Sequence, residues 1–244
     1  MAMFCFRTSP GGGTLIRLCA RLKGVFIFLA LLSLQAGAQD FEFLPEIDVY
    51  AKLNSSVRLS FQAKQTRENG EPTQAEIGPS IDFFMKPLVH LKRVSLYDLD
   101  ESKSRLLAFS FGYRYLPSPD APAVNRFVFQ ATPNLPVKGG FLFSDRNRGE
   151  LNLASGDLTW RYRNELTVQR TVAIHSYHVT PFGSVEVFYD SKYHKWSSTD
   201  LYAGARFPIR KHTQIEPYYE HENNTGKKHP QQIEVFGLIL SLHF

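Results

Sequence analysis

Residues 232–244, the last stretch of the chain, read QIEVFGLILSLHF and decide the fold class. After Glu234, every second residue is large and apolar, whereas the residues between them are small or mixed. The apolar set is Phe236, Leu238, Leu240, Leu242 and Phe244. A period of two predicts a β-strand, and one continuous apolar face is what a transmembrane β-barrel presents to lipid. The alternative interpretation is the last strand of a soluble β-sandwich.

The C-terminal residue supports the barrel. An amphipathic strand that ends on an aromatic residue, here Phe244, resembles the C-terminal signal by which bacterial outer-membrane barrels are recognised for insertion. We therefore expect two kinds of partner, the barrel-assembly machinery and the lipid of the outer membrane.

The N-terminal residues 1–38 have the features of a secretory signal peptide. Arg17, Arg21 and Lys23 precede an apolar run at 25–34, which is too short to span a bilayer as a helix. Ala36, Gly37 and Ala38 then match a small-x-small cleavage site, so we expect cleavage after Ala38. An uncleaved anchor helix is the alternative. The predicted mature domain is residues 39–244, exported to the outer membrane of a Gram-negative bacterium.

Removal of residues 1–38 changes the composition. Both cysteines, Cys5 and Cys19, are removed, so the mature chain is expected to hold no disulfide and no Cys-ligated metal. Four basic residues and no acidic ones are removed as well, which leaves 24 basic against 23 acidic residues of the original 28 and 23. This balance gives no reason to expect a nucleic-acid partner, and no sequence motif indicates a cofactor. Aromatic residues make up 14% of a chain whose mean hydropathy is −0.24, as expected of a barrel with a polar interior.

Alternating segments follow one another along the whole mature chain. Eleven are predicted as strands: 46–53, 57–64, 74–85, 104–115, 125–132, 140–151, 158–170, 177–190, 200–209, 213–222 and 232–244. They predict an all-β fold, a closed antiparallel up-and-down transmembrane barrel. Because bacterial single-chain barrels have an even number of strands, we expect about 12 strands, with residues 90–97 as the twelfth, and 10 as the alternative. Residues 97–103 are expected to form a short helix or an exposed loop.

Alternation also assigns the faces of the strands. One face of each strand is rich in large apolar residues and ends in Tyr, Trp or Phe, as in the aromatic girdles of outer-membrane barrels. Charged residues of both signs gather on the other face, which we expect to line the lumen. The lumen and binding candidates are Arg146, Arg148, Glu150, Arg161, Arg163, Glu165, Glu186, Asp190, Glu216 and Glu220. Guanidinium–carboxylate pairs are directional and often bidentate. This set therefore predicts either a network that braces and fills the lumen, or a selectivity lining or an anion-binding site.

Catalytic signals are weak in this sequence. It holds no Gly-x-Ser-x-Gly motif, and the nearest Ser/His/acid group is Asp190, Ser191 and His194, which lie too close together in sequence for a convincing triad. Glu220 and His221 are adjacent and therefore face opposite sides of a strand, which argues against a metal site. We predict no catalytic residues and no metal.

Several runs of the chain carry a family resemblance. They are 45–54, 112–115, 144–150, 160–164, 186–191 and 216–221, and they read PEIDVYAKLN, GYRY, SDRNRGE, WRYRN, EVFYDS and EPYYEH. In these runs the chain resembles the bacterial family called domain of unknown function 2490, over nearly the whole mature sequence. The resemblance implies an outer-membrane β-barrel. It implies no activity, and it transfers no catalytic residues.

The predicted function is therefore non-enzymatic: a small pore, a binding barrel or an envelope scaffold with an Arg/Glu-lined lumen. A lipid- or lipopolysaccharide-modifying hydrolase of the outer membrane is one alternative, and a soluble periplasmic β-sandwich binding protein is another. The sequence does not identify a transported or bound solute.

Overall fold

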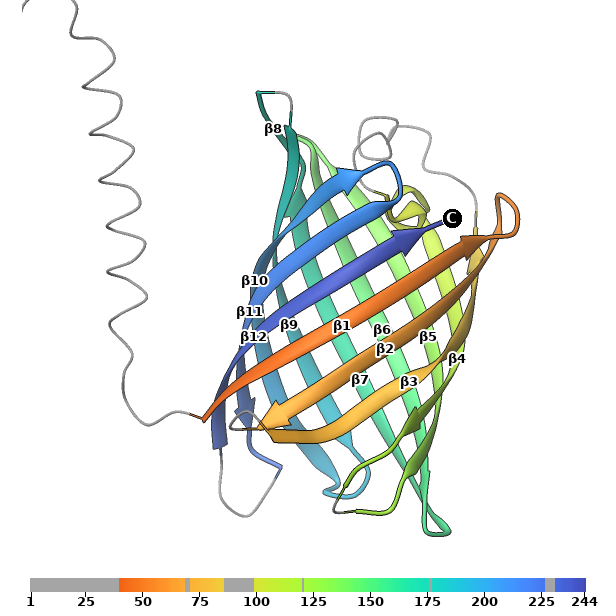
Figure 1. Cartoon of the computed structure of the whole chain (residues 1–244), viewed down its shortest axis with the longest axis vertical. Coiled ribbons are helices and arrows are strands. Elements are labelled where there is room, and N and C mark those ends of the chain that lie inside the picture. Colours follow the sequence, from red (N-terminus) through yellow and green to blue (C-terminus); the bar gives the residue numbers. More distant parts are fainter. Residues whose placement is uncertain (1–39, 69–70, 86–98, 120, 176, 227–230) are drawn as a thin grey trace, which may run out of the picture. The chain divides into compact units, whose positions relative to one another are not determined.

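The computed structural model describes residues 40–68, 71–85, 99–119, 121–175, 177–226 and 231–244. The predicted signal peptide and the proposed twelfth strand at 90–97 lie outside the described residues. The described chain forms one sheet that closes into a barrel (Figure 1). This closure overturns the β-sandwich alternative, because strands β9 and β10 are paired and leave no second sheet to pack against.

Among the described residues, the barrel wall contains eleven strands, and each of the eleven segments predicted as strands corresponds to one of them. They are β1 Asp40–Lys52, β2 Val57–Glu68, β3 Glu71–Phe84, β4 Leu107–Leu116, β5 Val124–Val137, β6 Phe141–Ala154, β7 Asp157–Arg170, β9 Tyr177–Asp190, β10 Lys195–Arg210, β11 Thr213–Asn224 and β12 Gln231–His243. A further strand, β8 Val172–Ile174, pairs only with β9 and extends beyond the wall.

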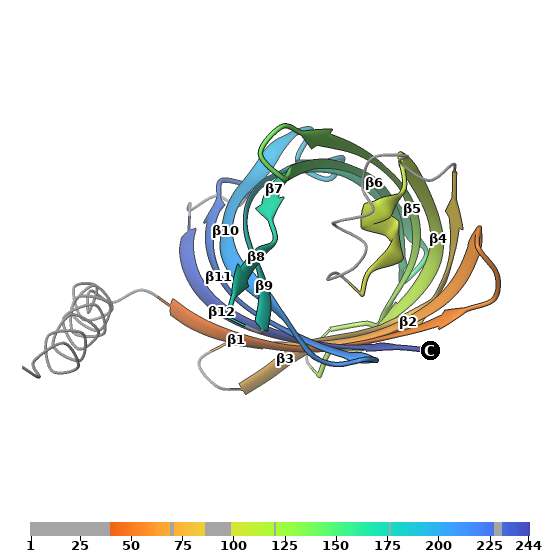
Figure 2. The same ribbon diagram turned by 90° about the horizontal axis from the view of Figure 1, so that it is seen from above.

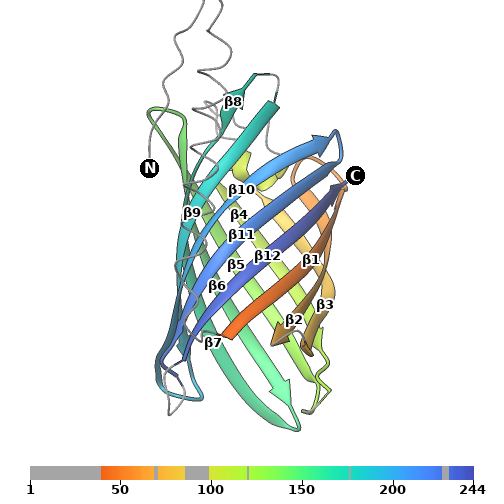
Figure 3. The same ribbon diagram turned by 60° about the vertical axis from the view of Figure 1, so that its left-hand side comes forward.

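The eleven strands of the described wall are close to the predicted number of about 12, but the predicted purely antiparallel pairing was wrong. Neighbouring wall strands are antiparallel except at the seam, where β1 and β12 run parallel with Leu44 beside Gly237 (Figure 3). With an odd number of alternating strands, the first and the last point in the same direction. The expectation of an even number rested on a general property of bacterial barrels and not on the residues.

One end of the barrel, which we call the η1 end, holds a single turn of 3-10 helix. This turn, η1 Glu101–Ser104, lies inside the ring of strands when the barrel is viewed along its axis (Figure 2). It confirms the predicted short helix for part of residues 97–103, and it folds inward where an exposed loop was the other expectation. No helix among the described residues is long and apolar enough to cross a membrane. The opposite end, with the Ser155–Gly156 turn, is called the far end.

The outer face of the wall is apolar and the inner face is polar. Large apolar side chains point outward and are exposed, for example Phe129 (45%), Leu166 (43%) and Phe236 (41%). Inward side chains are mostly polar and buried, so the lumen is filled by side chains. Gly237 illustrates how closely it is filled, because a Cβ there would lie 1.9 Å from the ring of Tyr218.

Candidate functional site

A network of ion pairs lies inside the barrel and joins side chains of β3, β4, β5, β6, β7 and β9. Glu150 and Glu186 are its central carboxylates, 1% and 0% exposed. Arg163 links them, because its guanidinium pairs with both oxygens of Glu186 at 2.7 and 2.8 Å and with Glu150 at 3.3 Å. Buried charges are costly unless they are paired with good geometry, and this bidentate pair has such geometry.

Glu150 has the largest number of cationic partners in the network. Arg161 and Arg148 approach it to 2.7 and 2.8 Å, and Arg126 approaches it to 3.6 Å. Arg146 extends the network from Glu186, at 3.1 Å, to Glu165. Seven predicted lumen residues therefore meet in one cluster: Arg146, Arg148, Glu150, Arg161, Arg163, Glu165 and Glu186.

The other three predicted residues lie outside this cluster. Glu216 on β11 pairs instead with Arg206 on β10 at 2.6 Å. Glu220 is buried toward the far end, directly across from Tyr202. Asp190 ends β9, where its carboxylate accepts a hydrogen bond from the amide of Lys192 at 2.7 Å and so stabilises the following turn.

Three members of the network were missing from the sequence prediction. Glu76 on β3 pairs with Arg126 at 2.9 Å, with Arg148 at 3.5 Å and with Arg114 at 3.7 Å. The inward positions of β3, β4 and β5 follow from the same alternation, so the sequence contained the signal for these residues. The complete network contains six arginines and four glutamates, a net charge of +2.

A second polar cluster holds η1 inside the barrel. Arg58 on β2 pairs with Asp82 and Asp100, each at 2.8 Å. The amide of Asn134 on β5 donates to the carbonyl groups of Ser102 and Arg105 at 3.0 and 2.9 Å. These contacts fix η1 to strands that are distant from it in sequence.

Asp100 begins η1 and accepts hydrogen bonds from the amide and hydroxyl groups of Ser102. Burial alone would raise the pKa of Asp100, but the cations of Arg58 and Lys103 hold this pKa below its usual range. A carboxyl group whose pKa is lower in the folded state stabilises that state above its unfolded pKa of about 3.9, and this stabilisation is lost as the pH falls further.

We therefore predict that η1 loosens in acid. Hydrogen exchange of the 101–105 amides, corrected for the intrinsic rate, should be slow at neutral pH and about tenfold faster once the pH is well below 3.9. Asp100→Asn should produce this faster exchange at neutral pH. Glu101→Gln is the matched control, because its partner Lys52 is exposed. Equal protection in wild type and Asp100→Asn would show that Asp100 does not hold η1.

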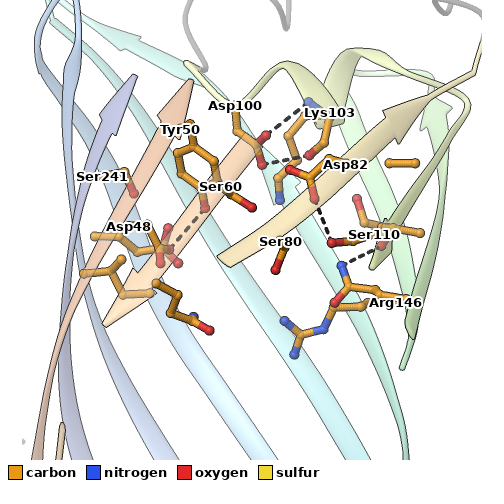
Figure 4. Close-up of a pocket in the computed structure, with 18 of the residues that line it drawn as sticks. Asp48, Tyr50, Ser60, Ser80, Asp82, Asp100, Lys103, Ser110, Arg146 and Ser241 are labelled. Atoms are coloured by element: carbon orange, nitrogen blue, oxygen red, sulfur yellow. Dashed lines mark hydrogen bonds between the residues drawn. The ribbon is translucent and has the colours of Figure 1, made fainter. Parts of the chain in front are cut away.

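Between η1 and the ion-pair network lies a polar cavity of about 360 Å³, shown in Figure 4. This volume has room for roughly a dozen water molecules. Many hydroxyl groups line it, including those of Ser60, Ser80, Ser110, Ser184 and Ser241. Arg146 reaches it from β6 with a partly exposed side chain and a buried Nε that has no hydrogen-bond acceptor.

Oxygen acceptors also line the cavity. Asp48 on β1 receives a hydrogen bond from Tyr50 at 3.1 Å, and no ion pair is found for its carboxylate among the described residues. Its neighbour across the seam is Ser241, which in turn pairs with Gln214 on β11. Gln214 is 3% exposed, and its Oε1 has no hydrogen-bond donor in the part of the chain that the structure describes. The lining thus includes a guanidinium group on β6 and oxygen acceptors on β1 and β11.

The Ser/His/acid group considered from the sequence is not assembled in the described residues. Ser191 lies in the turn between β9 and β10, where its hydroxyl accepts a hydrogen bond from the Trp160 amide at 2.9 Å. No hydrogen bond between Ser191 and His194 is found in the described part of the chain. No group of three His, Cys, Asp or Glu side chains there is arranged to hold a metal ion.

Comparisons with known proteins give one family match. Residues 97–233 match the model described as "Protein of unknown function (DUF2490)". Among solved structures, the chain is similar to a "Bacterial polysaccharide outer membrane secretin", with 10% identity, a TM-score of 0.41, and coverage of 75% of this chain and 74% of that chain. No sequence match was found among curated proteins.

Proposed function

Since the chain belongs to the DUF2490 family, which is defined without a function, we propose a role from the geometry: an integral outer-membrane barrel, non-enzymatic and closed to ions, that binds a small bipolar solute in its lumen. One observation carries the proposal. The cavity is lined by the partly exposed guanidinium of Arg146 and by the carboxylate of Asp48, which has no ion pair among the described residues, and the ion-pair network lies beneath it with Glu150 and Glu186 fully buried.

Membrane insertion is supported by the outer face of the barrel. A closed wall leaves no unpaired strand edge, which is a condition for spanning hydrocarbon. Near the far end, Trp160 stacks on Tyr189 with ring centroids 5.4 Å apart, and Trp196 packs against the edge of Tyr189 at 5.7 Å. Such aromatic groups favour the boundary between lipid and water. Recognition by the barrel-assembly machinery through β12 and Phe244 remains part of this proposal.

The expected solute carries a cationic and an anionic group at opposite ends. An ammonium group would donate to the Asp48 carboxylate. A carboxylate or phosphate group would pair with the partly exposed guanidinium of Arg146. The volume of the cavity is at the lower end of the range for small-molecule sites, about 300–1,000 Å³, so the solute is small.

The test is the thermal stability of the purified barrel in detergent micelles. γ-Aminobutyrate should raise the unfolding temperature by several degrees when it is well above its Kd, and butyrate or butylammonium alone should raise it less. Asp48→Asn should remove most of this difference, whereas Asp157→Asn, at the exposed start of β7, should retain it. Equal stabilisation by all three probes, or none at saturating concentration, would contradict the binding role. Partition into the aqueous phase without detergent would contradict membrane insertion.

A further inference from the structure

The outer face of β6 and β7 carries a polar cluster that neither the lumen nor the cavity explains. It consists of Asp145 and Asn147 on β6 and Tyr162 and Asn164 on β7. Asn147 is paired directly with Asn164 across the two strands. These residues share the face of the exposed side chain Leu166, so they point outward, away from the ion-pair network.

Apolar residues surround most of this cluster, and the residue paired with Tyr162 on β9 is Tyr189. They continue the same outward face along β6 and β7 and occupy the paired positions on β5 and β9: Phe141, Phe143, Leu151, Leu153, Leu158, Trp160, Leu166, Val168, Phe129, Ala131, Val185 and Val187. Asn147 is the seventh residue of the 14 in β6, and Asn164 is the eighth of 14 in β7. The cluster therefore lies near the middle of the wall.

The hydrogen bonds within the cluster use every side-chain donor it contains. The Asn164 amide donates to Asp145 Oδ1 at 2.6 Å and to Asn147 Oδ1 at 3.2 Å. The Asn147 amide donates to the carbonyl and to Oδ2 of Asp145 at 3.3 and 3.2 Å. The Tyr162 hydroxyl donates to Asn147 Oδ1 at 2.5 Å.

The acceptors of the cluster are in excess. An Asn amide group has two N–H donors and a Tyr hydroxyl group has one. The hydrogen bonds above therefore leave no side-chain donor of the cluster unused. Among the described residues, the Asp145 carboxylate accepts two side-chain hydrogen bonds of the roughly four that it can accept, and Asn164 Oδ1 accepts none. The cluster carries one negative charge and an unfilled capacity for donors.

This chemistry restricts what can cover the cluster. A carboxylate facing hydrocarbon is costly, and ionisable groups at that depth are generally paired. Lipid headgroups lie at the two ends of a membrane-spanning wall and not at its middle. A second copy of the same cluster would bring no free donor and a second negative charge.

We propose that this cluster docks a membrane-spanning partner protein that presents a lysine or arginine side chain within an apolar surface. The inference rests on the proposed membrane insertion and is independent of the luminal solute. Asp145 would pair with the cation, and Asn164 Oδ1 would accept a second hydrogen bond from it. The surrounding Phe, Leu and Val side chains would pack against the apolar surface of the partner.

The test uses a defined probe in phosphatidylcholine vesicles that contain the purified barrel. The probe is a membrane-spanning peptide of about 23 leucine and alanine residues with one central arginine, and the controls carry leucine or glutamate at that position. Energy transfer from the tryptophans to a label on the peptide measures association. The arginine peptide should bind wild type about fivefold more tightly than the leucine peptide, and the glutamate peptide should bind no more tightly than leucine.

Asp145→Asn should abolish the preference for arginine, and Asp157→Asn should leave it unchanged. No preference in wild type, an equal preference in Asp145→Asn, or a stronger affinity for the glutamate peptide would overturn the docking site. A wild-type dimer in sedimentation that Asp145→Asn dissociates would assign the cluster to self-association and would also overturn it. Failure of the barrel to float with the vesicles would instead contradict membrane insertion, so the two failures are distinguishable.

Discussion

Replacement of Glu150 by glutamine is expected to destabilise the folded barrel by about 3–5 kcal/mol, because it leaves buried cations without their carboxylate. Arg161 has Glu150 as its only ion-pair partner among the described residues, and Arg126, Arg148 and Arg163 would each lose one of two partners. The net charge of the network would rise from +2 to +3. Glutamine has nearly the same size, so the loss measures charge and hydrogen bonding rather than volume.

Urea unfolding in lipid vesicles, followed by tryptophan fluorescence, measures this loss. Glu216→Gln is the matched control, because this carboxylate is partly buried and pairs with one arginine, Arg206. We expect the control to cost clearly less than Glu150→Gln. Equal losses in the two variants would mean that the number of guanidiniums around Glu150 has no energetic consequence.

The strands were predictable because each strand has one apolar and one polar face. Period-two alternation is a local property, and it assigned Tyr177–Asp190 to a strand with the observed bounds. The number of strands and the parallel seam were not local. They depend on which strands meet when the sheet closes. The pairing of Leu44 with Gly237 joins the two ends of the chain, and no local sequence pattern predicts it.

The luminal network was partly predictable for the same reason. Alternation placed Arg163 and Glu186 on the inner face, but it gave no distances, and it could not show that Asp190 stabilises a turn. The position of η1 was not predictable, since its contacts with Arg58 and Asn134 join residues about 30 to 40 positions apart. The outer polar cluster breaks the alternation at Asn164, where the sequence pattern predicts an apolar residue.

The double substitution Arg163→Ala with Glu186→Ala is expected to open the lumen to ions. It removes both partners of the bidentate pair, so no buried charge loses its counter-ion in that pair. Arg146 keeps Glu165, and the net charge of the network stays at +2. In planar lipid bilayers, wild type should give no stepwise current, and the double variant should conduct with a preference for anions over cations, since the remaining excess charge is positive.

A second double substitution tests whether the volume of these two side chains, and not their charge, closes the lumen. Arg163→Met with Glu186→Met removes the same charges and retains most of the volume, and the replacement of a buried ion pair by apolar residues of similar size is often tolerated. This variant should stay closed if side chains fill the lumen at the level of Glu186. Current through wild type, or equal current through the alanine and methionine variants, would show that the network does not close the barrel. Current confined to the alanine variant would identify the Arg163–Glu186 pair as part of the barrier, with the cavity above it accessible only from the η1 end.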